Sequence, residues 1–135
     1  MARRAVIAVL AGSLVGVAAY ATIAPYDFTG AWAGTAQTPG KPVATLSADL
    51  TMTPPPAFTG TLTVVTSEET FHCTANGHQR RRVVITAPCD NTGRLTLRGT
   101  LDAGSGTLSG KLLWKPPPSE HKPAKHGMFT LIKQG

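Results

Sequence analysis

The chain has 135 residues, with 13 Lys and Arg against 7 Asp and Glu, for a formal net charge of +6. Its 14 glycines, 11 prolines and few charged residues indicate turns and strands rather than long helices. A chain of this length provides one domain with a modest core, and it excludes two independent domains.

The N-terminus carries a basic dipeptide, Arg3-Arg4, followed by the uncharged residues 5–24. A basic start, an apolar stretch and a small-residue cleavage site ending at Ala21 are typical of a secretory signal. About twenty apolar residues can also span a bilayer, so an uncleaved anchor is the alternative. We therefore expect residues 1–24 to be a signal peptide or signal anchor. The protein would be periplasmic or extracellular, or it would be held at a membrane by residues 5–24.

Residues 25–135 are predicted to form a single domain of short strands. Apolar side chains recur at every second position, the period of a strand with one buried face: Leu46 and Leu50, for example, alternate with Ser47 and Asp49. Segments rich in Pro, Gly and Asn separate these runs. The expected strands cover about 29–37, 43–53, 58–66, 69–75, 79–87, 94–102, 107–115 and 128–133.

Eight strands with short connections favour an all-β fold, an antiparallel up-and-down meander that closes into a small barrel. Closure is favoured because it removes exposed strand edges. A Gly-Thr-Leu phrase begins at Gly60, Gly99 and Gly106, and glycines on the apolar face allow the sharp bends that a small barrel needs. A two-sheet sandwich is the alternative architecture.

Three short segments resemble strands of known barrel proteins. Residues 29–32, Thr-Gly-Ala-Trp, resemble the Gly-x-Trp opening of the calycin group, the lipocalins and avidins. Residues 58–61 and 112–115 are similar to avidin-type strand phrases. The resemblance implies a small β-barrel with Trp32 at one end as a structural plug. Avidin-type biotin sites use several tryptophans, whereas this chain has only Trp32 and Trp114, so biotin is not the expected ligand.

The two cysteines and a nearby turn signal predict different hairpins. Asn76-Gly77 is a strong two-residue turn signal. A turn there would place Arg80 opposite Cys73, and Cys89 would lie roughly 30 Å further along the strand. A reversal centred on Arg81 would place the cysteines opposite each other, although three arginines make a poor tight turn. A wider excursion of the chain from Thr74 to Arg82 would also bring the sulfurs together. We expect a Cys73–Cys89 disulfide, because cysteines in exported proteins are usually oxidised.

The sequence offers no constellation typical of an enzyme or a metal site. Ser105 between two glycines has the look of a nucleophile elbow, but it lies between two alternating strands and indicates a turn. Glu68 and Glu69 are adjacent, and neighbours on a strand point to opposite faces, so they are not expected to share a proton. His72 beside Cys73 lacks a dependable ligand spacing. We therefore expect neither catalysis nor a cofactor.

Basic residues suggest one functional hypothesis. They gather at Arg80, Arg81 and Arg82 and again at Lys122 and Lys125. Arginine binds phosphate and carboxylate groups well, so an anionic lipid, polymer or protein of the cell envelope is a candidate partner. Nucleic acid is not expected, because the protein is exported and no aromatic residues are interleaved with the arginines to stack bases.

The apolar faces of the strands suggest the other hypothesis, an apolar or amphipathic small molecule bound inside the barrel or at its mouth. The alternative is that the same side chains fill the interior as a solid core. The candidate lining residues are Leu46, Leu50, Met52, Phe58, Leu62, Leu97, Leu112 and Trp114.

Overall fold

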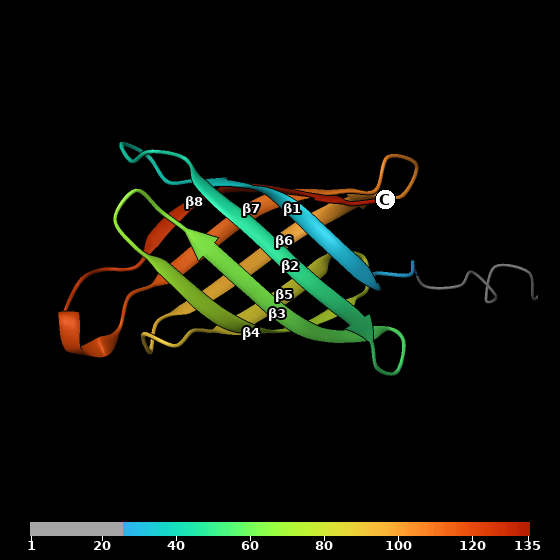
Figure 1. Cartoon of the computed structure of the whole chain (residues 1–135), viewed down its shortest axis with the longest axis horizontal. Helices are drawn as coiled ribbons and strands as arrows, with labels where there is room; N and C mark the ends of the chain where they lie inside the picture. Colours follow the sequence, from blue (N-terminus) through green and yellow to red (C-terminus); the bar gives the residue numbers. More distant parts are fainter. Residues whose placement is uncertain (1–25) are drawn as a thin grey trace, which may run out of the picture.

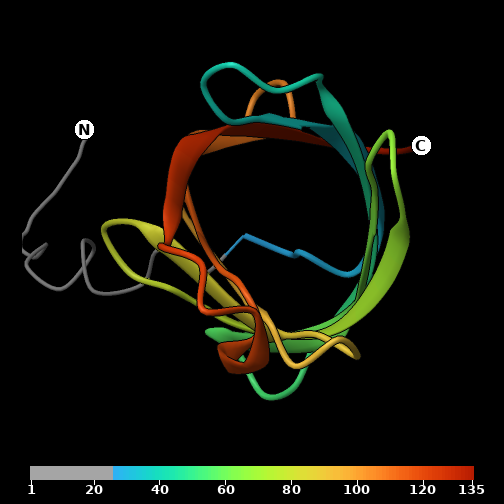
Figure 2. The same cartoon turned by 90° about the vertical axis from the view of Figure 1, so that its left-hand side faces the viewer.

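The computed structural model describes residues 26–135, which fold into a closed barrel of eight antiparallel strands (Figure 1). Each strand pairs with the next in sequence, and β8 pairs with β1 to complete the ring (Figure 2). This topology confirms the predicted barrel and excludes the alternative two-sheet sandwich. It is also compatible with the calycin-like resemblance. The strands are β1 Gly30–Gln37, β2 Ala44–Met52, β3 Ala57–Val65, β4 Thr70–Gln79, β5 Val83–Pro88, β6 Arg94–Asp102, β7 Thr107–Lys115 and β8 Lys125–Lys133.

The signal peptide or signal anchor predicted for residues 1–24 lies outside the described residues. Within residues 26–135, no helix is long and apolar enough to cross a membrane.

Side chains alternate between the barrel interior and the solvent, as a period of two requires. In β2, Leu46 and Leu50 are buried, whereas Ser47 and Asp49 are exposed. Among residues 26–135 no polar or charged residue is buried. The interior is therefore lined by apolar side chains along its whole length, and polar side chains are confined to the outer face and the two ends.

Aromatic side chains fill one end of the barrel, which we call the closed end. Residues 26–29 cross the ring before β1 begins, and the segment is visible in blue inside the ring in Figure 2. The Phe28 ring stacks on both Trp32 and Phe58, with centroids 5.5 and 4.5 Å apart. Trp32 Nε1 donates a hydrogen bond to the Phe28 carbonyl oxygen at 2.9 Å. Trp32 thus occupies the end position that the resemblance implies.

Hydrogen bonds fix the segment that crosses the closed end. The Tyr26 backbone N–H donates to Gln79 Oε1 at 3.0 Å, and Lys133 Nζ donates to the Asp27 carbonyl oxygen at 2.7 Å. The Thr29 backbone N–H donates to the Asp27 carboxylate at 2.9 Å, and this bond, helped by the Thr29 side chain, holds the pKa of Asp27 below its ordinary value. The segment therefore acts as a fixed cover over the aromatic cluster.

The hairpin between β4 and β5 turns at residues 80–82. Gln79 pairs with Val83, and the Arg80 backbone N–H donates to the Arg82 carbonyl oxygen at 3.0 Å. Three consecutive arginines form this turn, although they looked unsuited to it in the sequence. β4 consequently extends to Gln79, four residues beyond its expected end.

The alternative turn at Asn76-Gly77 is wrong, because both residues lie within β4 and pair with β5. Packing accounts for the glycine: a Cβ atom added at Gly77 would collide with the ring of Phe58 on neighbouring β3. Gly77 is therefore explained by the close approach of the closed-end cluster rather than by a turn conformation.

We predict that Gly77→Ala destabilises the fold by about 1–3 kcal/mol, because the added methyl group overpacks against Phe58. Asn76→Thr is the matched control, since position 76 is exposed on the same strand and threonine suits strands. Urea unfolding followed by circular dichroism measures both changes. A neutral Gly77→Ala combined with a destabilising Asn76→Thr would contradict the packing explanation.

Candidate functional site

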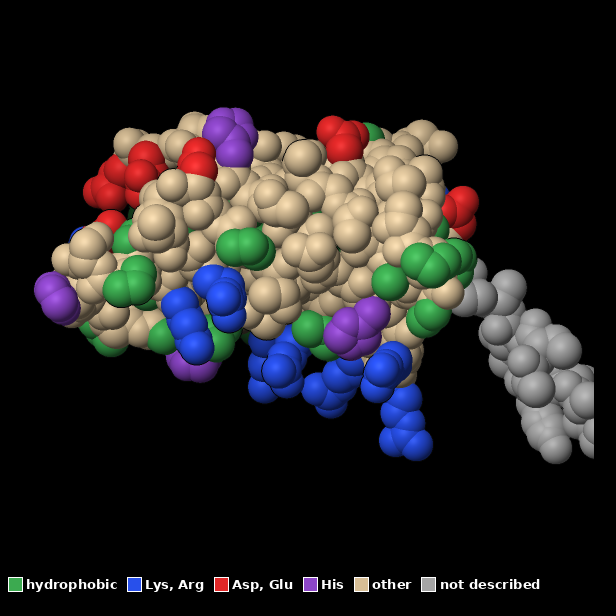
Figure 3. All heavy atoms as spheres, turned by 90° about the horizontal axis from the view of Figure 1, so that it is seen from below, with side chains coloured by type: hydrophobic (Ala, Val, Ile, Leu, Met, Phe, Trp, Pro, Cys, Tyr) green, Lys and Arg blue, Asp and Glu red, His purple; other side chains and the backbone are tan. Residues whose placement is uncertain are grey.

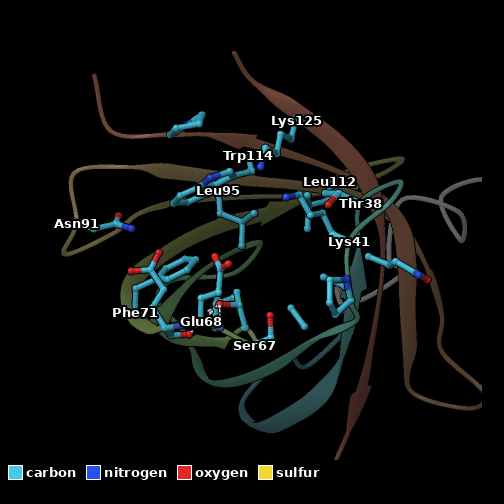
Figure 4. Close-up of a pocket in the computed structure, with 18 of the residues that line it drawn as sticks. Thr38, Lys41, Ser67, Glu68, Phe71, Asn91, Leu95, Leu112, Trp114 and Lys125 are labelled. Atoms are coloured by element: carbon cyan, nitrogen blue, oxygen red, sulfur yellow. Dashed lines mark hydrogen bonds between the residues drawn. The ribbon is translucent and has the colours of Figure 1, made fainter. Parts of the chain in front are cut away.

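The opposite end of the barrel, which we call the open end, contains a cavity of about 360 Å³ (Figure 4). It opens among the loops that connect β1 to β2, β3 to β4, β5 to β6 and β7 to β8. The apolar wall includes Ala36, Ala44, Leu46, Val64, Phe71, Leu95, Leu112 and Trp114. The charged and polar rim includes Thr38, Lys41, Ser67, Glu68, Glu69, Asn91, Glu120, Lys122 and Lys125.

Small side chains on β1 and β2 leave the open end hollow. Ala36 and Ala44 face each other across these two strands, and both line the cavity. At the closed end the same strands carry Trp32 and Leu50, which are buried in the core. The outermost inward position of each of these two strands at the open end thus carries an alanine, and space remains beside these small side chains.

An aromatic pair forms one side of the cavity wall. The rings of Phe71 on β4 and Trp114 on β7 lie with centroids 5.0 Å apart, although β5 and β6 separate these strands in the sheet. Gly93, in the loop between β5 and β6, approaches Trp114 so closely that a Cβ atom would collide with the indole. The position of the Trp114 ring therefore depends on this loop.

A disulfide holds that loop against β4. Cys73 and Cys89 are bonded, as predicted, with their Cα atoms 3.9 Å apart. The continuous ladder between β4 and β5 ends at Asn76 and Thr86, and an isolated antiparallel bridge pairs Cys73 with Cys89 further toward the open end. The covalent bond therefore reinforces this bridge near the open end, beyond the end of the continuous ladder. The bond also rules out Cys73 as a thiolate ligand, and it is consistent with an oxidising compartment.

Thr66 organises the loop between β3 and β4. Its hydroxyl oxygen accepts hydrogen bonds from the backbone N–H groups of Glu68 and Glu69 at 3.2 and 3.0 Å. Its own N–H donates to the Glu69 carbonyl oxygen at 2.9 Å. Glu68 and Glu69 therefore belong to a compact turn rather than a strand, and both line the cavity at its rim.

Charges of both signs surround the mouth of the cavity. Glu68 and Glu69 come from the β3–β4 loop, Lys41 from the β1–β2 loop, and Lys122 from the connection that contains the 3-10 helix η2, Pro118–Glu120. Lys122 Nζ lies 3.6 Å from the Glu120 carboxylate, and this is the one ion pair within residues 26–135. The arrangement combines an apolar wall with a charged, solvent-exposed rim.

The structure separates the eight candidate lining residues into two groups. Leu46, Leu112 and Trp114 line the cavity. The remaining five lie in or against the packed core in the middle and at the closed end: Leu50, Met52, Phe58, Leu62 and Leu97.

Sequence reasoning missed the other wall residues, notably Ala36, Ala44 and Phe71. The alternation marks them as inward-facing, but it carries no signal for which end of the barrel is hollow.

The candidate basic residues also divide between the two ends. Arg80, Arg81 and Arg82 form the β4–β5 hairpin at the closed end, whereas Lys122 and Lys125 line the cavity at the open end.

Within residues 26–135, no three His, Cys, Asp or Glu side chains are placed to hold a metal ion together. Neither a family model nor a curated protein sequence matches the chain.

We predict that replacing both cysteines, Cys73→Ala with Cys89→Ala, lowers the free energy of unfolding by about 3 kcal/mol, since the bond closes a loop between residues 16 apart in sequence. Urea unfolding gives this value. Hydrogen exchange should also quicken at the Asp90 backbone N–H, which donates to the His72 carbonyl oxygen at 2.8 Å beside the bond. Unchanged stability and exchange would contradict a structural role for the disulfide.

Proposed function

We propose that the protein is an exported, non-enzymatic binding protein that holds an apolar or amphipathic small molecule in the open end of its barrel. The observation that carries this proposal is the cavity of about 360 Å³ with an apolar wall, in a barrel whose other end is filled by aromatic side chains. A small barrel can be solid throughout, so a hollow confined to one end favours a ligand site.

The dimensions and chemistry of the cavity suit the apolar part of a small ligand. Its volume lies near the lower end of the range for small-molecule sites, about 300–1,000 Å³. Burial of apolar surface against the wall contributes about 25 cal/mol per Å², so most of the affinity would come from contacts with side chains such as Leu46, Leu112 and Trp114. A polar end of the ligand would remain at the rim, within reach of Lys41 or Glu68.

The placement of ionisable groups favours binding over catalysis. Within the described barrel, those that line the cavity stand at its rim, where solvent screens their charges. Catalytic acids and bases typically depend on burial or strong neighbouring charges to shift their pKa values. In this proposal the exposed rim charges orient an amphipathic ligand.

Two features support export. The Cys73–Cys89 bond suits an oxidising compartment. The basic dipeptide and uncharged stretch of residues 3–24 have the organisation of a secretory signal or a signal anchor.

Adjacent residues on β2 provide a direct test with 1-anilinonaphthalene-8-sulfonate as the probe. Ala44 lines the cavity, whereas Thr45 points to solvent. Ala44→Trp should fill the mouth and weaken probe binding by at least about tenfold, equivalent to about 1.4 kcal/mol. Thr45→Trp adds the same side chain outside and should leave binding unchanged. Fluorescence titration measures both affinities, and circular dichroism checks the fold.

We expect the unaltered protein to bind the probe saturably at one site. The absence of saturable binding, or equal weakening by the two tryptophan substitutions, would contradict the cavity as the binding site.

A further inference from the structure

Basic side chains gather on one outer face of the barrel. In Figure 3 they lie along the lower part of the view, while the Asp and Glu side chains of that view lie in its upper half. The face comprises the outward positions of β6 and β7 together with the β4–β5 hairpin. We call it the cationic strip, and it consists of Arg80, Arg81, Arg82, Arg94, Arg98, Lys111 and Lys115, all exposed.

The register places like charges directly opposite each other within this strip. Arg94 pairs with Lys115, and Arg98 pairs with Lys111, across β6 and β7. Like charges at opposed positions destabilise a sheet. The one ion pair in residues 26–135 is Glu120–Lys122 in the β7–β8 connection, so the described protein supplies no salt-bridge partner for either pair. An external anion would relieve the repulsion.

The arginine hairpin extends the strip to the closed end, beside the point where the chain enters the barrel. The Tyr26 backbone N–H is hydrogen-bonded to Gln79, the residue immediately before Arg80. In the sequence, the uncharged stretch 5–24 ends two residues before Tyr26. If that stretch is retained as an anchor, the three arginines lie at the side of the domain where a membrane begins.

Apolar side chains accompany the cations. Met128 pairs with Lys111 across β7 and β8 and is 60% exposed. Leu113 lies on β7 midway between Lys111 and Lys115 and is only partly buried. Lipid surfaces bind cations through headgroup phosphates and accept apolar side chains at the interface, whereas a soluble anionic polymer offers only the charge.

We propose that the cationic strip docks the barrel on an anionic lipid surface. The barrel then lies along the surface, because the strip runs from the hairpin at the closed end to Arg94 and Lys115 at the open end. Arginine and lysine side chains contact lipid phosphates, and Met128 enters the interface. This proposal rests on the outer face and is independent of the cavity.

The test compares binding of the exported protein to phosphatidylcholine vesicles with and without phosphatidylglycerol. The difference between the two vesicle types isolates the part of binding that depends on lipid charge. Arg98→Gln combined with Lys111→Gln should weaken this part by roughly ten- to thirtyfold, since each cation near the surface contributes about 1 kcal/mol. Lys41→Gln combined with Lys122→Gln removes the same charge elsewhere and should have little effect.

The Arg98→Gln and Lys111→Gln variant also removes a repulsive pair, so its thermal stability should be equal to or higher than that of the unaltered protein. Loss of vesicle binding in a stable protein would therefore support docking. Equal binding to both vesicle types, or equal weakening by the two double variants, would overturn the proposal. Binding to soluble heparin without a preference for phosphatidylglycerol would assign the strip to an anionic polymer instead.

Discussion

Closure of the sheet fixes the width of the interior, and the rest of the structure depends on that constraint. Eight strands enclose a space that side chains can just fill or that can hold one small ligand. The size of the inward side chains at each end therefore decides which of these happens. Phe28, Trp32 and Phe58 fill the closed end, whereas Ala36 and Ala44 leave the open end hollow.

The hollow end needs support that a packed core does not provide. The continuous ladder between β4 and β5 stops short of this end, and the Cys73–Cys89 bridge and its disulfide hold the two segments together there. The loop beyond Cys89 brings Gly93 against Trp114, so the disulfide also bears on the cavity wall. On another side of the mouth, hydrogen bonds to the Thr66 hydroxyl shape the loop that carries the acidic part of the rim. Stability and site geometry are thus linked at the same loops.

Sequence alone predicted the barrel because most of its strands alternate apolar and polar side chains, and the expected ranges of β6 and β7 match the structure. The alternative turn that the sequence suggested at Asn76-Gly77 is wrong. Gly77 is required by the close approach of Phe58, and in a sequence such a glycine cannot be distinguished from a turn glycine. β8 begins at Lys125, three residues earlier than expected. The sequence did not reveal this start because a histidine and a glycine interrupt the alternation there.

Alternation also identifies inward residues without saying which end is hollow. Arg94 lies opposite Lys115 because of the register between β6 and β7. The spacing of these residues along the sequence did not reveal that register.

The two ends of this one barrel differ: the closed end is packed and the open end is hollow. The chain has two tryptophans, and they report on different ends: Trp32 is buried in the closed end, and Trp114 lines the cavity. Two-dimensional NMR of the indole N–H groups during titration with 1-anilinonaphthalene-8-sulfonate tests this difference directly. The Trp114 signal should shift as the probe binds while the Trp32 signal stays fixed. A shift of Trp32 without Trp114, or equal shifts of both, would contradict the account.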